Sequence, residues 1–297
     1  MNLSRFLLIF LILISLLVYF FLTRVPSNKV TTTGELPKLY PYPVTIENPQ
    51  KPAEISAKSA IIIDAKTGVA LFEKDPDTRH LPASTTKLLT AIVAQERCDP
   101  QKVVKVERVV EEGTQMGLSE GDLVSVGNLL YGLLVASGND AAFVLADSCS
   151  DSYIHFVASM NQKAKELGMK NSHFINPAGF DDPLQYSTAR DLAKLAKVAV
   201  ANLQIAKIVA TRSIVVTDQL TTKTYYLENI NKLLGEVEGL EGVKTGQTEG
   251  SLEILLTKTT RNSHTIITAV LGSDDRFSES KQLIEWVFAN HRWVNPE

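Results

Sequence analysis

The sequence predicts an α+β domain behind an apolar N-terminal segment. Three observations carry this prediction. Two short apolar segments precede Ser84, helical patterns then run from 84 to about 208, and further β-type segments lead into a closing helix from about 276 to 290. Strands and helices that are segregated along the chain in this way are typical of α+β folds.

The composition is that of an ordinary globular protein and excludes several classes of function. Of the 297 residues, 44% are hydrophobic and 21% are charged, which is enough for a sizeable core. The formal net charge is −3 and no long run of one sign occurs, so we expect no nucleic-acid partner. The five histidines have no metal-ligand spacing and lie near no paired cysteines, so we predict neither a metal site nor a cofactor.

The first predicted element is an apolar segment at residues 6–22 that carries no charge. At ~1.5 Å per residue, a helix of this length crosses the ~30 Å hydrocarbon core of a bilayer with some local thinning. A cleaved signal peptide typically has a shorter apolar region of roughly 7–15 residues followed by small residues, whereas TRVPSNKV follows here. We therefore favour an uncleaved membrane anchor over a cleaved signal peptide. Arg5 lies on one side of the segment and Arg24 and Lys29 lie on the other, so the flanking charges do not decide its orientation.

Residues 24–52 form a predicted proline-rich linker. Half of the twelve prolines lie between Arg24 and Ala53. Proline favours the extended polyproline II conformation at ~3.1 Å per residue, so this stretch can hold a domain tens of Å from a membrane. The remaining residues, 53–297, are predicted to form one folded domain.

This domain opens with a predicted β-hairpin, SAIIIDAKTGVALFEK, in which a glycine supplies the turn conformation. The tripeptide Lys-Thr-Gly at 66–68 lies at the turn, where we expect its lysine to be solvated. The same tripeptide recurs at 244–246, on a predicted strand ahead of the β-branched segments SLEILLTKTT and HTIITAVLGS. A strand holds a lysine and a hydroxyl rigidly, so we expect the second copy to lie over a cleft.

A helix is predicted to begin near Ser84 in LPASTTKLLTAIVAQE, because a proline precedes it and an apolar run follows. Positions i and i+3 share one face of a helix, so Lys87 is expected beside Ser84. A catalytic serine without a His/Asp pair needs another base, and a lysine can supply one. Free backbone N–H groups at a helix N-terminus can also stabilise an oxyanion. Ser-x-x-Lys alone is a weak signal, and it recurs at 278–281.

A further polar group, Ser137-Gly-Asn139, lies between two apolar helical segments in LLVASGNDAA. A turn around the glycine can aim both side chains at one point, or the same residues can form a helix-capping turn, and the motif by itself leaves both interpretations open. A second Ser-x-Asn, at 159 and 161, lies within a helical pattern, where positions i and i+2 do not face each other.

The order of these motifs is more specific than any one of them. Ser84-x-x-Lys87, then Ser137-Gly-Asn139, then Lys244-Thr-Gly246 is the series of the penicillin-binding proteins and class A β-lactamases. With the stretches PASTTKLLTA, GLSEGDLVSVGNLLYGLLVASGNDAA, NPAGFDDPLQYSTARDLAKLA and FSESKQLIEWVF, the chain from about residue 53 resembles the serine D-Ala-D-Ala carboxypeptidases, the low-molecular-weight penicillin-binding proteins of peptidase family S11. The resemblance implies a β-lactamase/transpeptidase-like fold, an antiparallel five-stranded sheet flanked by helices with a mainly helical subdomain.

The resemblance also implies a role for each residue of the motifs. Ser84 is the expected nucleophile, and Lys87 is its expected general base once burial and the charge of Lys244 lower the pKa of the Lys87 amine. Ser137 is expected to relay a proton to the leaving D-Ala, while Asn139 holds Lys87 and the substrate amide.

The substrate itself is expected to meet a second set of groups. The resemblance implies that Lys244-Thr245-Gly246 binds the terminal carboxylate with help from Arg276, for which the alternative is a solvated residue in the first turn of a helix. The backbone N–H groups of Ser84 and Gln247 are expected to form the oxyanion hole.

These roles imply a membrane-anchored D,D-carboxypeptidase that removes the terminal D-Ala from peptidoglycan stem pentapeptides through a Ser84 acyl-enzyme. It would be acylated by β-lactams, and its catalytic domain would lie outside the bacterial cytoplasmic membrane. Residues 6–22 would then be a single-pass anchor and residues 1–5 a cytoplasmic stub. Two alternatives stay open: a serine β-lactamase, and a wall-binding or β-lactam-sensing module that acylates without turnover. No Glu-x-x-Leu-Asn stretch occurs, which weighs against a β-lactamase, and the full set of polar groups weighs against a mere binder.

Two departures from the family pattern bear on the site and on the anchor. Where relatives often have a glycine and an aromatic residue, this chain has Leu252 and Glu253, and a Glu253 side chain that faced the cleft would oppose an anionic substrate. Many relatives carry a further β-rich domain and a C-terminal amphipathic anchor, whereas this sequence stops at Glu297. We therefore expect residues 6–22 to provide the anchor.

The sequence contains two cysteines, Cys98 and Cys149. They lie about 21 and 15 Å along predicted helices that both leave the active site, at ~1.5 Å per residue, so their depths are comparable. An extracytoplasmic pair often forms a disulfide, and two buried free cysteines are the alternative.

Overall fold

The computed structural model describes residues 13–16, 19–20, 40–220 and 222–296. The chain divides into two units, 1–39 and Tyr40–Glu297, and the second is described here by itself. The predicted cytoplasmic stub lies outside the described residues, as does most of the predicted span at 6–22, of which Leu13–Leu16 and Tyr19–Phe20 are helical. Among the described residues, no helix has the length and apolar character that crossing a membrane requires.

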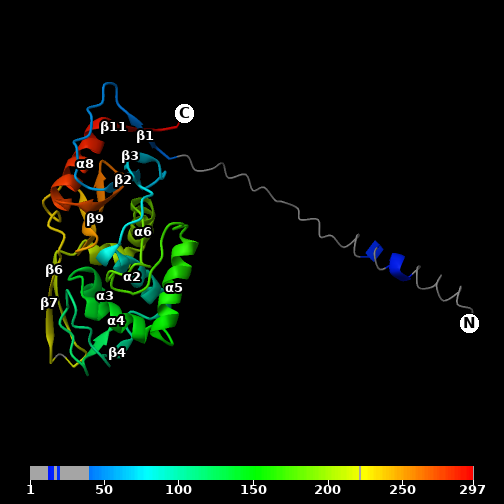
Figure 1. The fold of residues 1–297 in the computed structure, drawn as a ribbon, viewed down its shortest axis with the longest axis vertical. Helices are drawn as coiled ribbons and strands as arrows, with labels where there is room; N and C mark the ends of the chain where they lie inside the picture. The colour runs from blue at the N-terminus through cyan, green and yellow to red at the C-terminus, as the bar shows by residue number, and fades with distance from the viewer. Residues whose placement is uncertain (1–12, 17–18, 21–39, 221, 297) are drawn as a thin grey trace, which may run out of the picture. The chain divides into compact units, whose positions relative to one another are not determined.

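A five-stranded antiparallel sheet forms the centre of the domain, as the family resemblance implied (Figure 1). Its strand order is β3-β2-β10-β9-β8. Its strands are β2 (Ser59–Asp64), β3 (Ala70–Lys74), β8 (Leu240–Thr248), β9 (Leu252–Arg261) and β10 (His264–Ser273). β2 and β10 are apolar and β-branched and lie inside the sheet, whereas β8 lies at one edge. Because β8 has one unpaired edge, it can face the turn η1 (Ala83–Thr86), which we call the catalytic turn after the predicted nucleophile Ser84.

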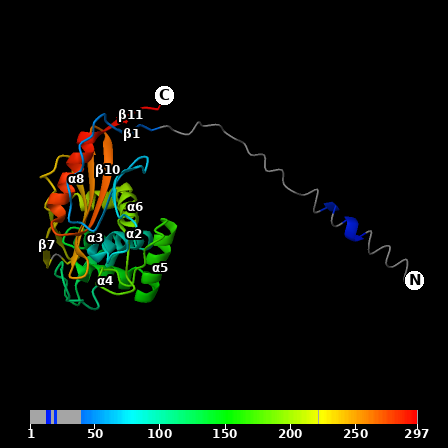
Figure 2. The same cartoon turned by 45° about the horizontal axis from the view of Figure 1, so that its top comes forward.

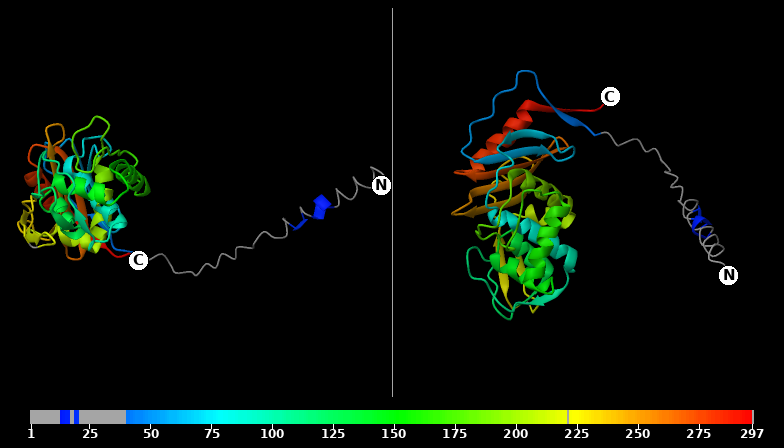
Figure 3. Two further views of the ribbon diagram at one scale, coloured as in Figure 1. Left: turned by 90° about the horizontal axis from the view of Figure 1, so that it is seen from below. Right: turned by 45° about the vertical axis from the view of Figure 1, so that its right-hand side comes forward.

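The two faces of the sheet bury two separate apolar clusters. Side chains alternate along a strand, so Ile61 and Ile63 of β2 enter one cluster while Ala60 and Ile62 enter the other. The first cluster packs against the helical subdomain, and the second lies under α8 (Arg276–Asn290). Figures 2 and 3 show α8 and the helical subdomain on opposite sides of the strands.

The helical subdomain occupies the chain between η1 and β8. Its helical elements are η1 (Ala83–Thr86), α2 (Lys87–Arg97), α3 (Val126–Leu134), α4 (Asn139–Ser148), α5 (Tyr153–Glu166), α6 (Ala189–Ala201) and α7 (Leu203–Val209). Side chains of Ser125, Ser152, Thr188 and Asn202 cap α3, α5, α6 and α7 by accepting backbone N–H groups. The caps satisfy N–H groups that the first turn of each helix leaves without a partner.

Two short strand pairs accompany these helices. β4 (Val103–Lys105) pairs with β5 (Leu123–Ser125) inside the stretch that the sequence pattern assigned to helices. β6 (Ser213–Thr217) pairs with β7 (Thr224–Glu228) after the last helix of the subdomain. The three-residue strands β4 and β5 are too short to show a period of two in the sequence, so the pattern could not separate them from the neighbouring helices.

The compact unit begins at Tyr40 and not at the predicted boundary of Ala53. β1 (Tyr42–Thr45) pairs with β11 (His291–Val294), and the indole N–H of Trp286 donates to the carbonyl of Gln50. Pro43 lies within β1 and is compatible with this strand, because a two-stranded pair has outer edges that need no N–H donor. The described part of the predicted linker therefore belongs to the domain.

Candidate active site

Ser84 and Lys87 lie together at the junction of η1 and α2. Ser84 is the second residue of the 3-10 turn and is partly exposed, whereas Lys87 begins α2 and is fully buried. Residues i and i+3 eclipse each other in a 3-10 turn, which brings the Lys87 Nζ atom within 2.8 Å of the Ser84 Oγ atom. The sequence placed Ser84 at the start of a helix, and the structure places it one turn ahead of the α-helix proper.

The Lys87 amine is held by three oxygen atoms from three parts of the chain. Its Nζ atom lies 2.8 Å from Ser84 Oγ, 2.6 Å from Asn139 Oδ1 and 2.9 Å from the carbonyl oxygen of Ala178. Burial lowers the pKa of Lys87 well below its usual value, and the charge of Lys244 lowers it further, while Asp140 opposes the shift. An amine with a lowered pKa can accept a proton from the neighbouring serine near neutral pH.

Ser137 and Asn139 occupy the turn between α3 and α4. Ser137 has a φ of +60°, a left-handed conformation that a residue with a side chain seldom adopts. Gly138 is the N-cap of α4 and no side chain caps this helix, so Ser137 is not used for capping. Its Oγ atom accepts a 2.8 Å hydrogen bond from Lys244, while Asn139 points at Lys87. The turn therefore directs both side chains toward one point, as the first of the two interpretations of this motif expected.

The side chain of Lys244 extends from the edge strand β8 to Ser137. It is 2% exposed, and its Nζ atom donates to Ser137 Oγ at 2.8 Å and to the carbonyl of Thr245 at 3.1 Å. Burial lowers the pKa of Lys244 to about 7, with a further contribution from the charge of Arg276.

Gly246 explains why a glycine follows this lysine and threonine. A Cβ atom at Gly246 would lie 3.1 Å from the Cβ atom of Ala83 and 3.3 Å from the backbone nitrogen of Ser84. A larger residue would push β8 away from the catalytic turn. The next residue, Gln247, is exposed.

Arg276 is buried and does not match the alternative of a solvated helix residue. It is 6% exposed at the start of α8, and its Nη1 atom donates a 2.8 Å hydrogen bond to the carbonyl of Gly246. Burial lowers the pKa of Arg276, and the charge of Glu253 opposes that shift. The buried Nε atom has no hydrogen-bond partner among the residues that the structure describes. Arg276 therefore brings positive charge to the end of β8 that carries Lys244-Thr245-Gly246.

Two features that hold the candidate site residues in place were not foreseen from the sequence. The first is Asp140, a fully buried carboxylate whose oxygens accept the backbone N–H groups of Met116, Gly117 and Leu118 at 2.9–3.0 Å. It fixes the loop between β4 and β5. The same loop accepts a hydrogen bond from Asn139, whose Nδ2 atom donates to the carbonyl of Glu112 at 2.7 Å. The only available signal was an aspartate directly after the Ser-Gly-Asn motif.

The second feature is the loop that supplies the Ala178 carbonyl. Asn176 accepts the backbone N–H groups of Gly179 and Phe180, and Gln185 donates to the carbonyl of Phe180. Gly179 lies against the catalytic turn, where a Cβ atom would be only 1.8 Å from the carbonyl oxygen of Ala83. The stretch NPAGF carried the family resemblance, but its contact with Lys87 is visible only in the folded chain.

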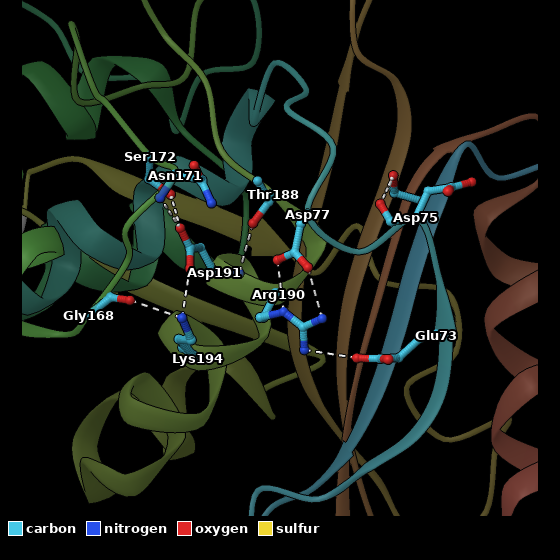
Figure 4. A network of polar contacts seen from close by, with 11 residues as sticks. Glu73, Asp75, Asp77, Gly168, Asn171, Ser172, Thr188, Arg190, Asp191 and Lys194 are labelled. Carbon is cyan, nitrogen blue, oxygen red and sulfur yellow. Dashed lines mark hydrogen bonds and ion pairs between the residues drawn. The ribbon is translucent and has the colours of Figure 1, made fainter.

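A polar network outside the cleft fixes the segment that leads from β3 to Ser84 (Figure 4). Arg190 donates two hydrogen bonds to Asp77 at 2.8 and 2.9 Å and forms an ion pair with Glu73 at 2.8 Å. Just ahead of the catalytic turn, the backbone of His80 exchanges hydrogen bonds of 2.8 and 2.9 Å with Ser187. These contacts tie the catalytic turn to the start of α6.

Two of the motif copies outside the predicted series form hydrogen bonds within their own turn or helix. In the first Lys-Thr-Gly copy, Thr67 donates to Asp64 within the β2–β3 turn. Ser159 and Asn161 both donate back to carbonyls of their own helix, at His155 and Val157. None of these residues contacts Ser84 or Lys87 in any hydrogen bond of the described chain. The described residues also contain no group of three His, Cys, Asp or Glu side chains that could hold a metal ion.

A disulfide joins Cys98 to Cys149, with 5.5 Å between their Cα atoms. Cys98 ends α2 and Cys149 ends α4, so the bridge links the far ends of the helices that begin at Lys87 and Asn139. The structure thus favours the disulfide over the alternative of two free buried cysteines.

Known proteins resemble this chain over most of its length. A family model described as D-alanyl-D-alanine carboxypeptidase, peptidase S11, matches residues 45–275. DacF of Bacillus subtilis is 33% identical over 79% of this chain and 63% of its own length, so this chain spans less than two thirds of that relative. A D-alanyl-D-alanine carboxypeptidase of a Streptomyces species is 32% identical over 90% of this chain and 99% of its own length.

Solved structures give the same result. The crystal structure of a Streptomyces DD-transpeptidase is 31% identical and has a TM-score of 0.77, covering 81% of this chain and all (100%) of that one. DacD of Francisella tularensis, a D-alanyl-D-alanine carboxypeptidase, is 28% identical with a TM-score of 0.74 over 82% of this chain and 73% of its own. The fold and the family that the three motifs indicated are therefore confirmed: this chain belongs to the peptidase S11 family of D-alanyl-D-alanine carboxypeptidases.

Proposed function

We propose that this protein is a membrane-anchored serine D,D-carboxypeptidase that removes the terminal D-Ala from peptidoglycan stem pentapeptides through an acyl-enzyme on Ser84. The observation that carries the proposal is the 2.8 Å contact between Ser84 Oγ and the fully buried Lys87, whose pKa is lowered by burial. Membership of the S11 family supports the same reaction.

Acylation begins with proton transfer from Ser84 to the neutral Lys87 amine. The serine oxygen attacks the carbonyl carbon of the penultimate D-Ala and forms a tetrahedral oxyanion, for which the backbone N–H groups of Ser84 and Gln247 are the proposed donors. Ser137 gives its proton to the nitrogen of the leaving D-Ala as the peptide bond breaks. The hydrogen bond from Lys244 to Ser137 orients this hydroxyl.

The terminal carboxylate of the substrate is proposed to bind at the end of β8. Lys244, Thr245 and Arg276 surround this position, and Gly246 lets the strand approach Ser84. A bound carboxylate favours the charged form of Lys244 and so raises its pKa in the complex. Asn139 is proposed to hold both Lys87 and the amide of the substrate.

Hydrolysis of the acyl-enzyme completes the cycle. After Lys87 has passed its proton to Ser137, the neutral Lys87 amine takes a proton from a water molecule that attacks the ester carbonyl. Lys87 returns this proton to the Ser84 oxygen as the ester bond breaks, which frees Ser84 and the shortened peptide. An amine acceptor in place of water would give transpeptidation, the activity for which the similar Streptomyces DD-transpeptidase is named. The two outcomes share every residue proposed here.

One experiment tests the proposal. The purified protein is incubated with a stem pentapeptide ending in D-Ala-D-Ala, and free D-Ala is measured together with β-lactam hydrolysis. We expect catalytic release of D-Ala from the wild type and none from Ser84→Ala. Penicillin labelling without D-Ala release would instead indicate a sensor or binding module, and rapid β-lactam turnover without D-Ala release would indicate a β-lactamase.

The proposal places residues 6–22 in the cytoplasmic membrane, the linker that starts at residue 24 outside it, and the domain beyond in the space that contains peptidoglycan. The apolar and uncharged character of residues 6–22 supports the anchor. Protease added to intact spheroplasts should then remove the domain, whereas protection until lysis would reverse this topology.

A further inference from the structure

A pocket lies at the end of the central sheet where the β2–β3 and β9–β10 turns meet the C-terminal part of α6. It has a volume of about 540 Å³, and none of the residues proposed above for catalysis or substrate binding, which we call the catalytic group, lines it. The residues that matter for its chemistry are Tyr40, Lys66, Lys197, Lys258, His264 and Trp293. Lys66 belongs to the first Lys-Thr-Gly copy, which the proposed reaction does not use.

Positive charge at this pocket is not balanced by the protein. Lys258 forms an ion pair with Glu241. Neither Lys66 nor Lys197 has a carboxylate at ion-pair distance within the described ranges; Lys66 is exposed and Lys197 is partly exposed. The turn that carries Lys66 approaches Lys197, because a Cβ atom on Gly68 would lie 4.0 Å from the Lys197 Nζ atom. Both lysines line the same pocket, and binding of an anion there would offset the repulsion between their charges.

The one carboxylate that lines the pocket is already used. Asp64 is 1% exposed, and its oxygens accept the Thr67 backbone N–H and hydroxyl at 2.7 Å and the Trp293 indole N–H at 2.8 Å. It therefore fixes the β2–β3 turn against β11 and leaves the two lysines available to a ligand.

Aromatic side chains of Tyr40, His264 and Trp293 form part of the pocket wall. The Trp293 ring stacks on His264 with centroids 4.6 Å apart, and the Lys66 Nζ atom lies 4.2 Å from the centre of the Tyr40 ring. Apolar walls with a few converging polar groups are typical of small-ligand sites, and about 540 Å³ is within their usual range. Such walls suit sugar rings and methyl groups, and the lysines suit carboxylates.

We propose that this pocket is a second binding site, separate from the catalytic group, for an anionic glycopeptide segment of the peptidoglycan strand. The choice of ligand rests on the proposed function, because a polymer whose stem peptides carry carboxylates and whose glycan carries sugar rings offers both chemistries at once. A second contact on the same polymer raises the effective concentration of stem peptides at Ser84 without any change in the catalytic group.

The test measures binding of the full-length protein in detergent to purified peptidoglycan sacculi that have been freed of accessory anionic polymers. Ser84→Ala is the background, so that the wall is not processed during the assay. We expect Lys66→Ala/Lys197→Ala to raise the apparent Kd about tenfold and to abolish most of its dependence on salt. The matched control, Lys165→Ala/Lys170→Ala, removes two exposed lysines that do not line the pocket and should bind like the background.

A parallel assay separates this proposal from the proposed function. With Ser84 intact, both double variants should release D-Ala from a soluble pentapeptide at the wild-type rate, which also shows that they fold. Equal binding of the two double variants to sacculi would overturn the pocket as a wall site, whether or not D-Ala is released. Binding only to sacculi that retain their accessory polymers would overturn the assignment to peptidoglycan carboxylates.

Discussion

Glu253 accepts a 3.0 Å hydrogen bond from the backbone N–H of Arg276, so its carboxylate lies at the N-terminus of α8 beside a cation of the candidate site. Across the sheet it pairs in register with Gln247, whose N–H is a proposed oxyanion donor. The carboxylate thus caps a helix and also adds negative charge near the proposed position of the substrate carboxylate.

We expect Glu253→Gln to lower the KM for a stem pentapeptide about two- to fivefold with little change in kcat. The amide oxygen still accepts the Arg276 N–H, while the repulsion between two carboxylates, of order 1 kcal/mol through partly aqueous surroundings, is removed. Steady-state kinetics with Glu120→Gln, an exposed change elsewhere, as control would check this. A KM equal to that of the wild type would mean that Glu253 does not act on the substrate.

Lys87→Ala should slow acylation by a fluorescent penicillin about 10²–10⁴-fold, since it removes the proposed general base that lies 2.8 Å from the nucleophile. Lys281→Ala is the control, because Lys281 stands in the other Ser-x-x-Lys and is exposed on α8. Time courses of labelling give both rates. Near-normal acylation of Lys87→Ala would remove it from the base role.

The dependence of kcat/KM on pH should be bell-shaped. Lys87 must be neutral to accept a proton, so activity should fall as pH decreases through its lowered pKa. Lys244 must be charged to bind the substrate carboxylate, so activity should fall as pH rises through about 7, the lowered pKa of Lys244. Lys244→Arg should shift the alkaline limb upward, because a guanidinium stays charged there. An unchanged alkaline limb in that variant would assign it to another group.

Asp140→Ala should destabilise the domain by about 3–5 kcal/mol, because three backbone N–H groups lose a buried acceptor. Asp147→Ala on the same helix removes only the partner of the exposed Arg108 and should cost about 1 kcal/mol or less. Urea unfolding of both variants compares them directly. Equal losses of unfolding free energy would contradict the special role of Asp140.

The disulfide closes a loop over a sequence separation of 51 residues. Replacing both Cys98 and Cys149 by alanine should lower the unfolding free energy by about 2–4 kcal/mol, mainly because the unfolded chain gains freedom. A maleimide should label no thiol in denatured, unreduced protein and two after reduction. Two thiols labelled before reduction would show that the bridge does not form.

The sequence by itself determined the features that depend on local spacing. The apolar and β-branched runs at β2 and β10 and the helical patterns after Ser84 predicted the order of strands and helices along the chain. The i, i+3 spacing predicted that Lys87 lies beside Ser84. The motif series identified the family. These features are local because a side chain's direction follows from the period of its own element.

Only the tertiary structure decided which distant groups meet. Lys87 contacts Asn139 and Ala178, 52 and 91 positions away, and Lys244 contacts Ser137 across 107 positions. The pairing of β1 with β11, the burial of Arg276 and the anchoring of a loop by Asp140 are likewise set by packing between elements. No local period records such contacts, because the free energy of burying a polar group depends on which partners the rest of the chain brings to it.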